Sequence, residues 1–286
     1  MSVLVIGCGY LGKQAAQLWT ERSRETYCLT RSADRSNQFM NAGFKPIVAD
    51  ITQSDSLANL PDIDTVLFAV GFDRTRYENI RDVYVDGLQN VLNHLPRSIS
   101  QFIYISSTGV FGNCGGDWVD ENSPTDPQRP GGKACLEAEN LIRESWLANR
   151  AVILRLAGIY GPDRIPRIDA IKNRDWTSLA ASGHINLIHV ADAAKIILAV
   201  ESHQLANELL LVSDGNPPHR KDFYQFIADQ LNVGQIDWSA NVDPESGRRA
   251  SADKKVSNRK LIDRIEYKFS FPSYHRGILD AMDGLK

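Results

Sequence analysis

The chain of 286 residues has only four cysteines, and none of them lies in the C-x-x-C spacing that marks many zinc and redox sites. Long apolar runs are also lacking, since none approaches the roughly 20 residues that cross a bilayer. With 32 basic and 35 acidic residues, the net charge of −3 gives no general attraction to nucleic acid or to an anionic membrane. We therefore expect no metal site, no membrane span and no nucleic-acid partner.

What remains is the composition of a globular protein. Hydrophobic residues make up 43% of the chain and charged residues 23%, which is typical of folded, soluble proteins. Because the first apolar run starts at Ser2, we expect no signal peptide. Isolated cysteines are typical of a reducing compartment, so we expect reduced thiols and a cytoplasmic location.

A glycine-rich segment joins the first apolar run, residues 2–6, to a helical stretch that ends near Arg22. Its G-x-G-x-x-G spacing is typical of a dinucleotide-binding turn when a strand precedes it and a helix follows. In such a turn the glycines permit a tight bend and a close approach to the pyrophosphate, and the helix N-terminus offers N–H groups. An ordinary strand-to-helix turn is the alternative. The residues predicted to bind the cofactor here are Gly7, Gly9, Tyr10, Leu11 and Gly12.

The residues after the second expected strand, 25–30, bear on which dinucleotide is bound. An acidic residue at this place selects NAD through the ribose hydroxyls, whereas NADP sites have small or basic residues. Here the chain has Arg31, whose guanidinium can bind a 2′-phosphate through two hydrogen bonds. The alternative is a solvated arginine that Asp34 neutralises. We predict NADP as the cofactor, with NAD as the second choice.

Apolar runs alternate with helical patterns through the first two thirds of the chain, which predicts an α/β fold with a Rossmann-type, doubly wound parallel sheet. Residues 1–160 are expected to form the NAD(P)-binding domain. Residues 161–286 are expected to complete the sheet and form a smaller C-terminal substrate lobe. The expected strands span residues 2–6, 25–30, 45–49, 65–70, 101–106, 151–156 and 208–212, and the main helices span 11–22, 37–42, 78–95, 132–149, 190–200 and 220–231.

Four segments, in order along the chain, resemble motifs of one family: residues 102–112 (FIYISSTGVFG), 133–137 (KACLE), 155–162 (RLAGIYGP) and 189–194 (HVADAA). Through them the chain resembles the extended short-chain dehydrogenase/reductase group, often labelled the NAD-dependent epimerase/dehydratase family. The resemblance implies that Ser107 bonds a substrate oxygen and that Lys133 holds the nicotinamide ribose. It also implies cofactor contacts from Asp50 and Ile51 after the third strand and from Ala69 and Val70 after the fourth.

The chain departs from that family at the catalytic tyrosine of its Y-x-x-x-K pair, where it has Arg129, four residues before Lys133. An arginine has no neutral form at working pH and cannot serve as the acid. Pro130 suits a first helical position, so we expect the helix to begin near it, with Arg129 as a cap. The asparagine expected in the helix after the fourth strand is also replaced, by Tyr84. The proton would then come from water, from the substrate or from Tyr160 after the sixth strand.

Two functions stay open. The first is an NAD(P)-dependent oxidoreductase, epimerase or dehydratase that acts on a small carbonyl compound or a nucleotide sugar through Ser107, Lys133 and Tyr160. The second is a catalytically inactive dinucleotide-binding sensor or regulatory protein, which would explain Arg129 directly. By analogy with the family we expect a small-molecule substrate and a possible homodimer through the helices at residues 78–95 and 132–149. The basic segment at residues 248–260 is either a solvated surface or a set of arginines that bind an anionic substrate.

Overall fold

The computed structural model describes residues 1–75, 79–240 and 252–283. Contacts divide the chain into two compact units, each built from three separate segments. Unit 1 comprises Met1–Val110, Pro127–Arg155 and Ala193–Leu210, and unit 2 comprises Phe111–Asp126, Leu156–Asp192 and Leu211–Lys286. Within the described part of the chain, no helix combines the length and the apolar character needed to cross a membrane. Arg248 and Arg249 of the basic segment lie outside the described residues.

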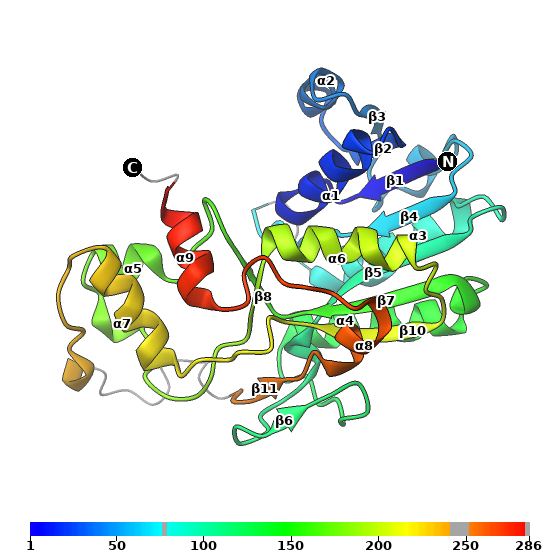
Figure 1. Ribbon diagram of the computed structural model, residues 1–286. Helices are drawn as coiled ribbons and strands as arrows, with labels where there is room; N and C mark the ends of the chain where they lie inside the picture. The colour runs from blue at the N-terminus through cyan, green and yellow to red at the C-terminus, as the bar shows by residue number, and fades with distance from the viewer. Residues whose placement is uncertain (76–78, 241–251, 284–286) are drawn as a thin grey trace. The chain divides into compact units, whose positions relative to one another are not determined.

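A seven-stranded sheet runs through the molecule in the order β10-β7-β5-β4-β1-β2-β3 (Figure 1). The inner strand β1 pairs in parallel with β2 on one side and with β4 on the other, so the direction of winding reverses there. Such a reversal makes a crevice at the carboxyl ends of the strands where ligands bind. The expected doubly wound sheet is confirmed. Its strands are β1 (Ser2–Ile6), β2 (Glu25–Thr30), β3 (Lys45–Val48), β4 (Thr65–Phe68), β5 (Gln101–Ser107), β7 (Ala151–Leu156) and β10 (Glu208–Val212).

Helices cover this sheet on both faces. On one side the buried Trp19 of α1 donates its indole N–H to Glu201 of α6 at 2.8 Å. On the other side the indole of Trp146, just after α4, donates to the carbonyl of Leu92 in α3 at 3.2 Å. The helical elements are α1 (Tyr10–Glu21), α2 (Ala33–Asn41), the π-helical turn η2 (Asp82–Asp86), α3 (Gly87–His94), α4 (Pro130–Glu144) and α6 (Val190–Ser202).

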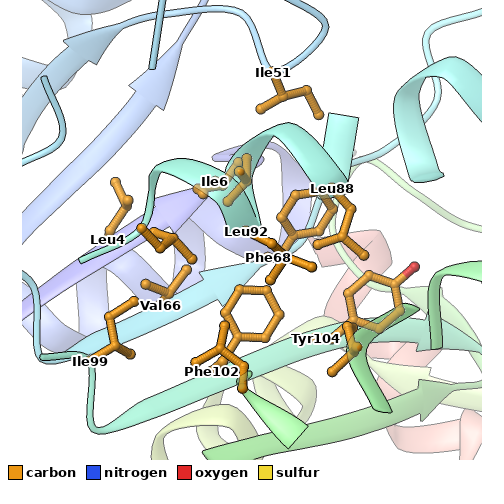
Figure 2. Packing of buried hydrophobic residues seen from close by; sticks show 14 of the residues in the cluster. Leu4, Ile6, Ile51, Val66, Phe68, Leu88, Leu92, Ile99, Phe102 and Tyr104 are labelled. Atoms are coloured by element: carbon orange, nitrogen blue, oxygen red, sulfur yellow. The ribbon is translucent and has the colours of Figure 1, made fainter. Parts of the chain in front are cut away.

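One hydrophobic core of unit 1 lies between the sheet and the helices α3 and α4. Figure 2 shows alternate residues of β1 and β4, among them Leu4, Ile6 and Phe68, on the face that meets Leu88 of α3. Because side chains alternate along a strand, the intervening residues point to the opposite face. The Phe68 ring lies 5.8 Å from the ring of Tyr104. The strands are buried on both faces, which explains why their sequences are apolar almost without interruption.

One charged cluster is buried in unit 1 and fastens α4 to the sheet. Glu139 of α4 is fully buried and pairs with Arg155 of β7 through two bonds of 2.9 and 2.7 Å. The hydroxyl of Ser106 in β5 donates to the same carboxylate at 2.6 Å. The partly exposed Arg143 adds a contact of 3.0 Å. This network fixes α4 against the end of β5, next to Ser107.

Unit 2 is built from shorter elements. β8 (Gly158–Tyr160) pairs in parallel with β9 (Leu187–His189), and β6 (Trp118–Val119) pairs in parallel with β11 (Lys255–Val256). Its core packs Tyr160, Phe223 and Tyr274 together with aliphatic side chains. The helices are α5 (Ile168–Lys172), α7 (Arg220–Gln230), α8 (Arg259–Ile265) and α9 (Tyr274–Asp283).

Candidate dinucleotide and active site

The glycine-rich loop between β1 and α1 leaves space where a phosphate would lie. Gly7 has a φ of 94°, and a Cβ on it would lie 2.4 Å from the Ala69 carbonyl. A Cβ on Gly12 would lie 2.3 Å from the carbonyl oxygen of Gly7. A Cβ on Gly9, by contrast, would meet nothing within 4 Å. Side chains are thus excluded at Gly7 and Gly12 by the fold itself, whereas the bare backbone at Gly9 borders open space.

Two other predicted cofactor residues, Ala69 and Val70, lie against this loop. Gly9 is the N-cap of α1, and its carbonyl accepts the first helical bond from Lys13 at 2.9 Å. The start of α1 therefore presents N–H groups and the positive end of the helix dipole beside the open backbone at Gly9. Ala69 and Val70 follow β4 directly and touch Gly7. These residues fit the pyrophosphate of a dinucleotide.

Two arginines follow β2. Arg31 is exposed, and its guanidinium lies 3.7 Å from the Asp73 carboxylate. Arg35, in the first turn of α2, donates from Nη2 to the carbonyl oxygen of Cys8 in the glycine-rich loop at 2.8 Å. Its guanidinium is therefore held against the loop. The sequence predicted Arg31 as a site residue, and this contact of Arg35 was missed because it depends on how α2 packs.

Asp50 and Ile51 follow β3. The Asp50 carboxylate accepts from the backbone N–H of Thr52 at 3.0 Å and from its hydroxyl at 2.8 Å, which makes a local turn. Ile51 is buried, and its carbonyl accepts from the side-chain amide of Asn90 in α3 at 2.9 Å. Asn90, which the sequence did not single out, thus fixes the backbone next to the predicted adenine-contact pair.

Ser107 and Lys133 lie on two segments of unit 1 that touch. Ser107 ends β5, and its hydroxyl accepts from the backbone N–H of Gly109 at 3.0 Å. A Cβ on Gly132 would lie 2.3 Å from the carbonyl oxygen of Gly109, so the start of α4 rests directly on the Ser107 loop. Lys133 is exposed, and its N–H donates to the carbonyl of Arg129 at 3.0 Å. The glycine before Lys133 is what permits this close packing.

Arg129 lies outside the helix that holds Lys133. The helix α4 begins at Pro130, and Arg129 is its N-cap residue with extended backbone angles, φ −105° and ψ 150°. The expectation that the helix begins near Pro130 is confirmed, as is the position of Arg129 as a cap. The arginine side chain is exposed.

Tyr160 belongs to unit 2, where it is fully buried at the end of β8. A Cβ on Gly277 of α9 would lie 2.0 Å from its hydroxyl oxygen, and the His189 ring meets it edge-on at 5.2 Å. Burial raises the pKa of Tyr160 far above its ordinary value, and the nearby carboxylates of Asp214 and Asp192 act in the same direction. Its role as a proton donor stays a prediction.

A glycine-rich phosphate loop at the reversal point of a parallel sheet defines a dinucleotide-binding α/β protein. Residues 3–210 match the model of the NAD dependent epimerase/dehydratase family, and the chain belongs to that family.

Several known proteins are similar over nearly the whole length. Protein YeeZ of Escherichia coli K12 is 24% identical over 281 residues, covering 94% of this chain and 96% of that protein. A structure from Methylobacillus flagellatus, described as an NAD-dependent epimerase/dehydratase, is 28% identical with a TM-score of 0.77, covering 99% and 98%. The fold is also that of the Bordetella bronchiseptica enzyme WbmG in complex with NAD and UDP, at 18% identity and a TM-score of 0.80, covering 100% and 96%.

Proposed function

We propose that this protein is an NAD(P)-dependent oxidoreductase or epimerase that acts on a small carbonyl compound or a nucleotide sugar. The observation that carries the proposal is the junction of β5 and α4, where Ser107 and Lys133 lie on touching segments of the unit that also holds the glycine-rich loop. The complex of WbmG with NAD and UDP is consistent with a nucleotide-linked substrate.

The bound dinucleotide would accept or supply the hydride, and the residues of unit 1 would hold and orient the reactants. The loop from Gly7 to Gly12, with Tyr10 and Leu11 at the start of α1, would bind the pyrophosphate. Asp50 and Ile51 would contact the adenine, and Ala69 and Val70 would line the cofactor along β4. Lys133 would bond the nicotinamide ribose, and the Ser107 hydroxyl would donate to the substrate oxygen.

NADP is the cofactor that the basic residues after β2 favour. Arg31 and Arg35 are both exposed, and no acidic residue ends β2. A guanidinium can bind the 2′-phosphate through two charge-assisted hydrogen bonds. Fluorescence titrations should show tighter binding of NADPH than of NADH. Arg31→Ala should reduce the ratio of the two dissociation constants about tenfold, which corresponds to a loss of about 1.4 kcal/mol of binding free energy for NADPH. Equal affinities in the wild type would overturn this preference.

The proton donor proposed from the sequence is Tyr160, with water or the substrate as alternatives. Because the Tyr160 hydroxyl is fully buried within unit 2, it would need a local opening to reach any substrate. A Tyr160→Phe variant that loses turnover but still binds NADPH would support this role. Full turnover in that variant would exclude it.

The competing proposal is a dinucleotide-binding protein without turnover, and Arg129 at the place of the family's tyrosine supports it. Single-turnover hydride transfer from NADPH, measured on a panel of carbonyl compounds and nucleotide sugars, separates the two proposals. Turnover in the wild type supports the enzyme. NADPH binding without turnover in the wild type, together with turnover in Arg129→Tyr, supports the sensor.

We also propose a homodimer in the cytoplasm. The support is the family analogy for the helices α3 and α4, and the four cysteines, which are all unbonded. Light scattering at micromolar protein concentration tests the dimer.

A further inference from the structure

Glu137 lies one helical turn beyond Lys133 on α4, and Lys133 is the residue proposed to bond the nicotinamide ribose. Residues four apart on an α-helix are neighbours on its surface, so a lysine and a glutamate at this spacing can form an ion pair. Both side chains are exposed. An ion pair with Glu137 would hold the Lys133 ammonium away from a bound dinucleotide, unless another group binds the Glu137 carboxylate first.

The group that binds the Glu137 carboxylate is the guanidinium of Arg81. Its Nε donates to Oε1 at 2.9 Å and to Oε2 at 3.2 Å, and its Nη2 donates to Oε1 at 2.6 Å. Both carboxylate oxygens are thus engaged in charge-assisted bonds, which are stronger than bonds between neutral groups. Among the residues that the structure describes, none forms an ion pair or a side-chain hydrogen bond with Lys133.

Arg81 is itself oriented by the π-helical turn η2, which begins at the next residue. The i→i+5 repeat of a π-helix brings residues five apart onto the same side, whereas an α-helix does this for residues three and four apart. Asp86, five residues after Arg81, accepts from Arg81 Nη1 at 2.8 and 3.1 Å. The guanidinium therefore spans two carboxylates, with one edge on Asp86 and the other on Glu137.

The residues just before η2 also lie against the start of α4. A Cβ on Gly131 would lie 3.6 Å from the side chain of Ile80, which directly precedes Arg81. The backbone N–H of Arg81 donates to the side-chain oxygen of Asn79 at 3.0 Å. All of these residues belong to unit 1. Arg81 is thus fixed beside the helical turn that contains Lys133.

Arg143, further along α4, offers a comparison on the same helix. Its Nη2 donates to the Glu139 carboxylate at 3.0 Å, and its Nη1 donates to the side-chain oxygen of Asn140 at 3.0 Å. Glu139 is also bound by the buried Arg155. Removal of Arg143 therefore releases no carboxylate toward Lys133, whereas removal of Arg81 releases Glu137.

We propose that Arg81 is a positioning residue, which holds Glu137 away from Lys133 and so keeps the Lys133 ammonium available for the nicotinamide ribose. The inference rests on the proposed function. Arg81 itself does not touch the cofactor in this arrangement. It acts by binding the Glu137 carboxylate, and Asp86 keeps its guanidinium in place. Without Arg81, Glu137 competes with the dinucleotide for the Lys133 ammonium.

The test is Arg81→Met, which removes the guanidinium and keeps a straight aliphatic stem. We expect NADPH to bind about threefold more weakly, the size of effect that an exposed ion pair can exert. Adding Glu137→Gln removes the competing charge and should restore the affinity of the wild type. Arg143→Ala is the matched control and should bind NADPH as the wild type does. Unchanged affinity in Arg81→Met, or a loss that Glu137→Gln does not restore, would overturn the proposal.

Amine labelling separates failure of this inference from failure of the proposed function. Trace acetylation of the cofactor-free protein by acetic anhydride, read by mass spectrometry, measures the reactivity of the Lys133 amine, which an ion pair with a carboxylate reduces. The reactivity should fall about threefold in Arg81→Met and recover when Glu137→Gln is added. If the wild type binds no NADPH but Lys133 responds in this way, the proposed function fails and the role of Arg81 stands. NADPH binding in the wild type, with equal Lys133 reactivity in all three proteins, would refute that role.

Discussion

The two units of this protein satisfy their backbone polar groups in different ways. In unit 1 long strands pair in a regular parallel ladder, and the main buried charges are those of the Glu139–Arg155 pair. In unit 2 the strands are two or three residues long, so side-chain carboxylates take over. Asp192, fully buried, accepts from the Tyr267 hydroxyl at 2.8 Å and from the backbone N–H groups of Ser270 and Phe271 at 2.9 and 2.8 Å.

Asp253 likewise accepts hydrogen bonds from backbone N–H groups in a second segment of unit 2. Its carboxylate accepts from the backbone N–H of His184 at 2.8 Å and lies 2.9 Å from the imidazole Nδ1. Its own carbonyl accepts from the N–H groups of Cys114 and Gly116. Partial burial opposes ionisation, but the bonds from His184 and the charge of Arg220 lower the pKa of Asp253 overall. Side-chain acceptors can therefore satisfy the backbone N–H groups of irregular segments, as the ladder of hydrogen bonds does within a sheet.

The largest effect is expected in unit 1, where Glu139→Ala would leave Arg155 buried without its carboxylate. Breaking a buried ion pair from one side costs about 3–5 kcal/mol, so the free energy of unfolding measured in urea should fall by that amount. Arg143→Ala removes an exposed partner of the same carboxylate and should cost less than about 1 kcal/mol. Equal losses in the two variants would contradict the account of this cluster.

A pH effect is expected in unit 2 from Asp214, which is 4% exposed. Burial raises the pKa of Asp214 to about 7, and the charge of Asp192 contributes. Since the unfolded state releases this proton near pH 4 and the folded state holds it to about pH 7, this group makes the folded state less stable as pH rises through that window. The free energy of unfolding should therefore fall by about 3 kcal/mol between pH 5 and pH 8, and this group should cause no further fall above pH 8.

Asp214→Asn has no proton to lose, so its free energy of unfolding should lack this decline. Urea titrations of both proteins at several pH values provide the measurement. Identical pH profiles for the wild type and the variant would show that Asp214 titrates normally.

A smaller and local effect is expected from Asp192→Asn. The neutral amide keeps one acceptor oxygen, so one of the three donors that Asp192 now binds is left without a partner at a cost of about 2 kcal/mol. Hydrogen exchange at the amides of Ser270 and Phe271 should accelerate, while exchange at Val5 in β1 should not change. Equal acceleration at Val5 and at the amides of Ser270 and Phe271 would contradict a local role of Asp192 in unit 2.

The sequence predicted the regular unit well because long apolar strands carry a strong local signal. The bounds of β1, β2, β7 and β10 agree with the expected strands to the residue. The helix expected at residues 78–95 is present within its described part, but it contains the π-helical turn η2 just before α3, which the sequence did not predict. The strands β6 and β11 pair residues far apart in the chain, such as Trp118 with Lys255, and two residues cannot show a periodic pattern.

At the site, too, features with a local sequence signal were predicted and features that depend on packing were not. The glycine-rich loop could be predicted because the motif itself demands a bare backbone there, whereas its contact with Ala69 is seen only in the structure. The contact of Arg35 with the Cys8 carbonyl and the bond from Asn90 to Ile51 could not be predicted. They depend on the packing of α2 and α3, which no local pattern encodes. Tyr84 was noticed in the sequence as a departure from the family, but the π-helical turn that contains it was not predicted.

The central claim is that unit 1 binds NAD(P) over the bare backbone at Gly9. The most direct test is an NADPH fluorescence titration of Gly9→Leu beside the wild type, with thermal unfolding of both. Since a Cβ at this position meets nothing within 4 Å, the variant should fold with an unchanged Tm. Its side chain should fill the phosphate space and weaken binding by about 100-fold, equivalent to about 2.7 kcal/mol. NADPH binding as tight as in the wild type, in a variant that folds normally, would contradict the claim.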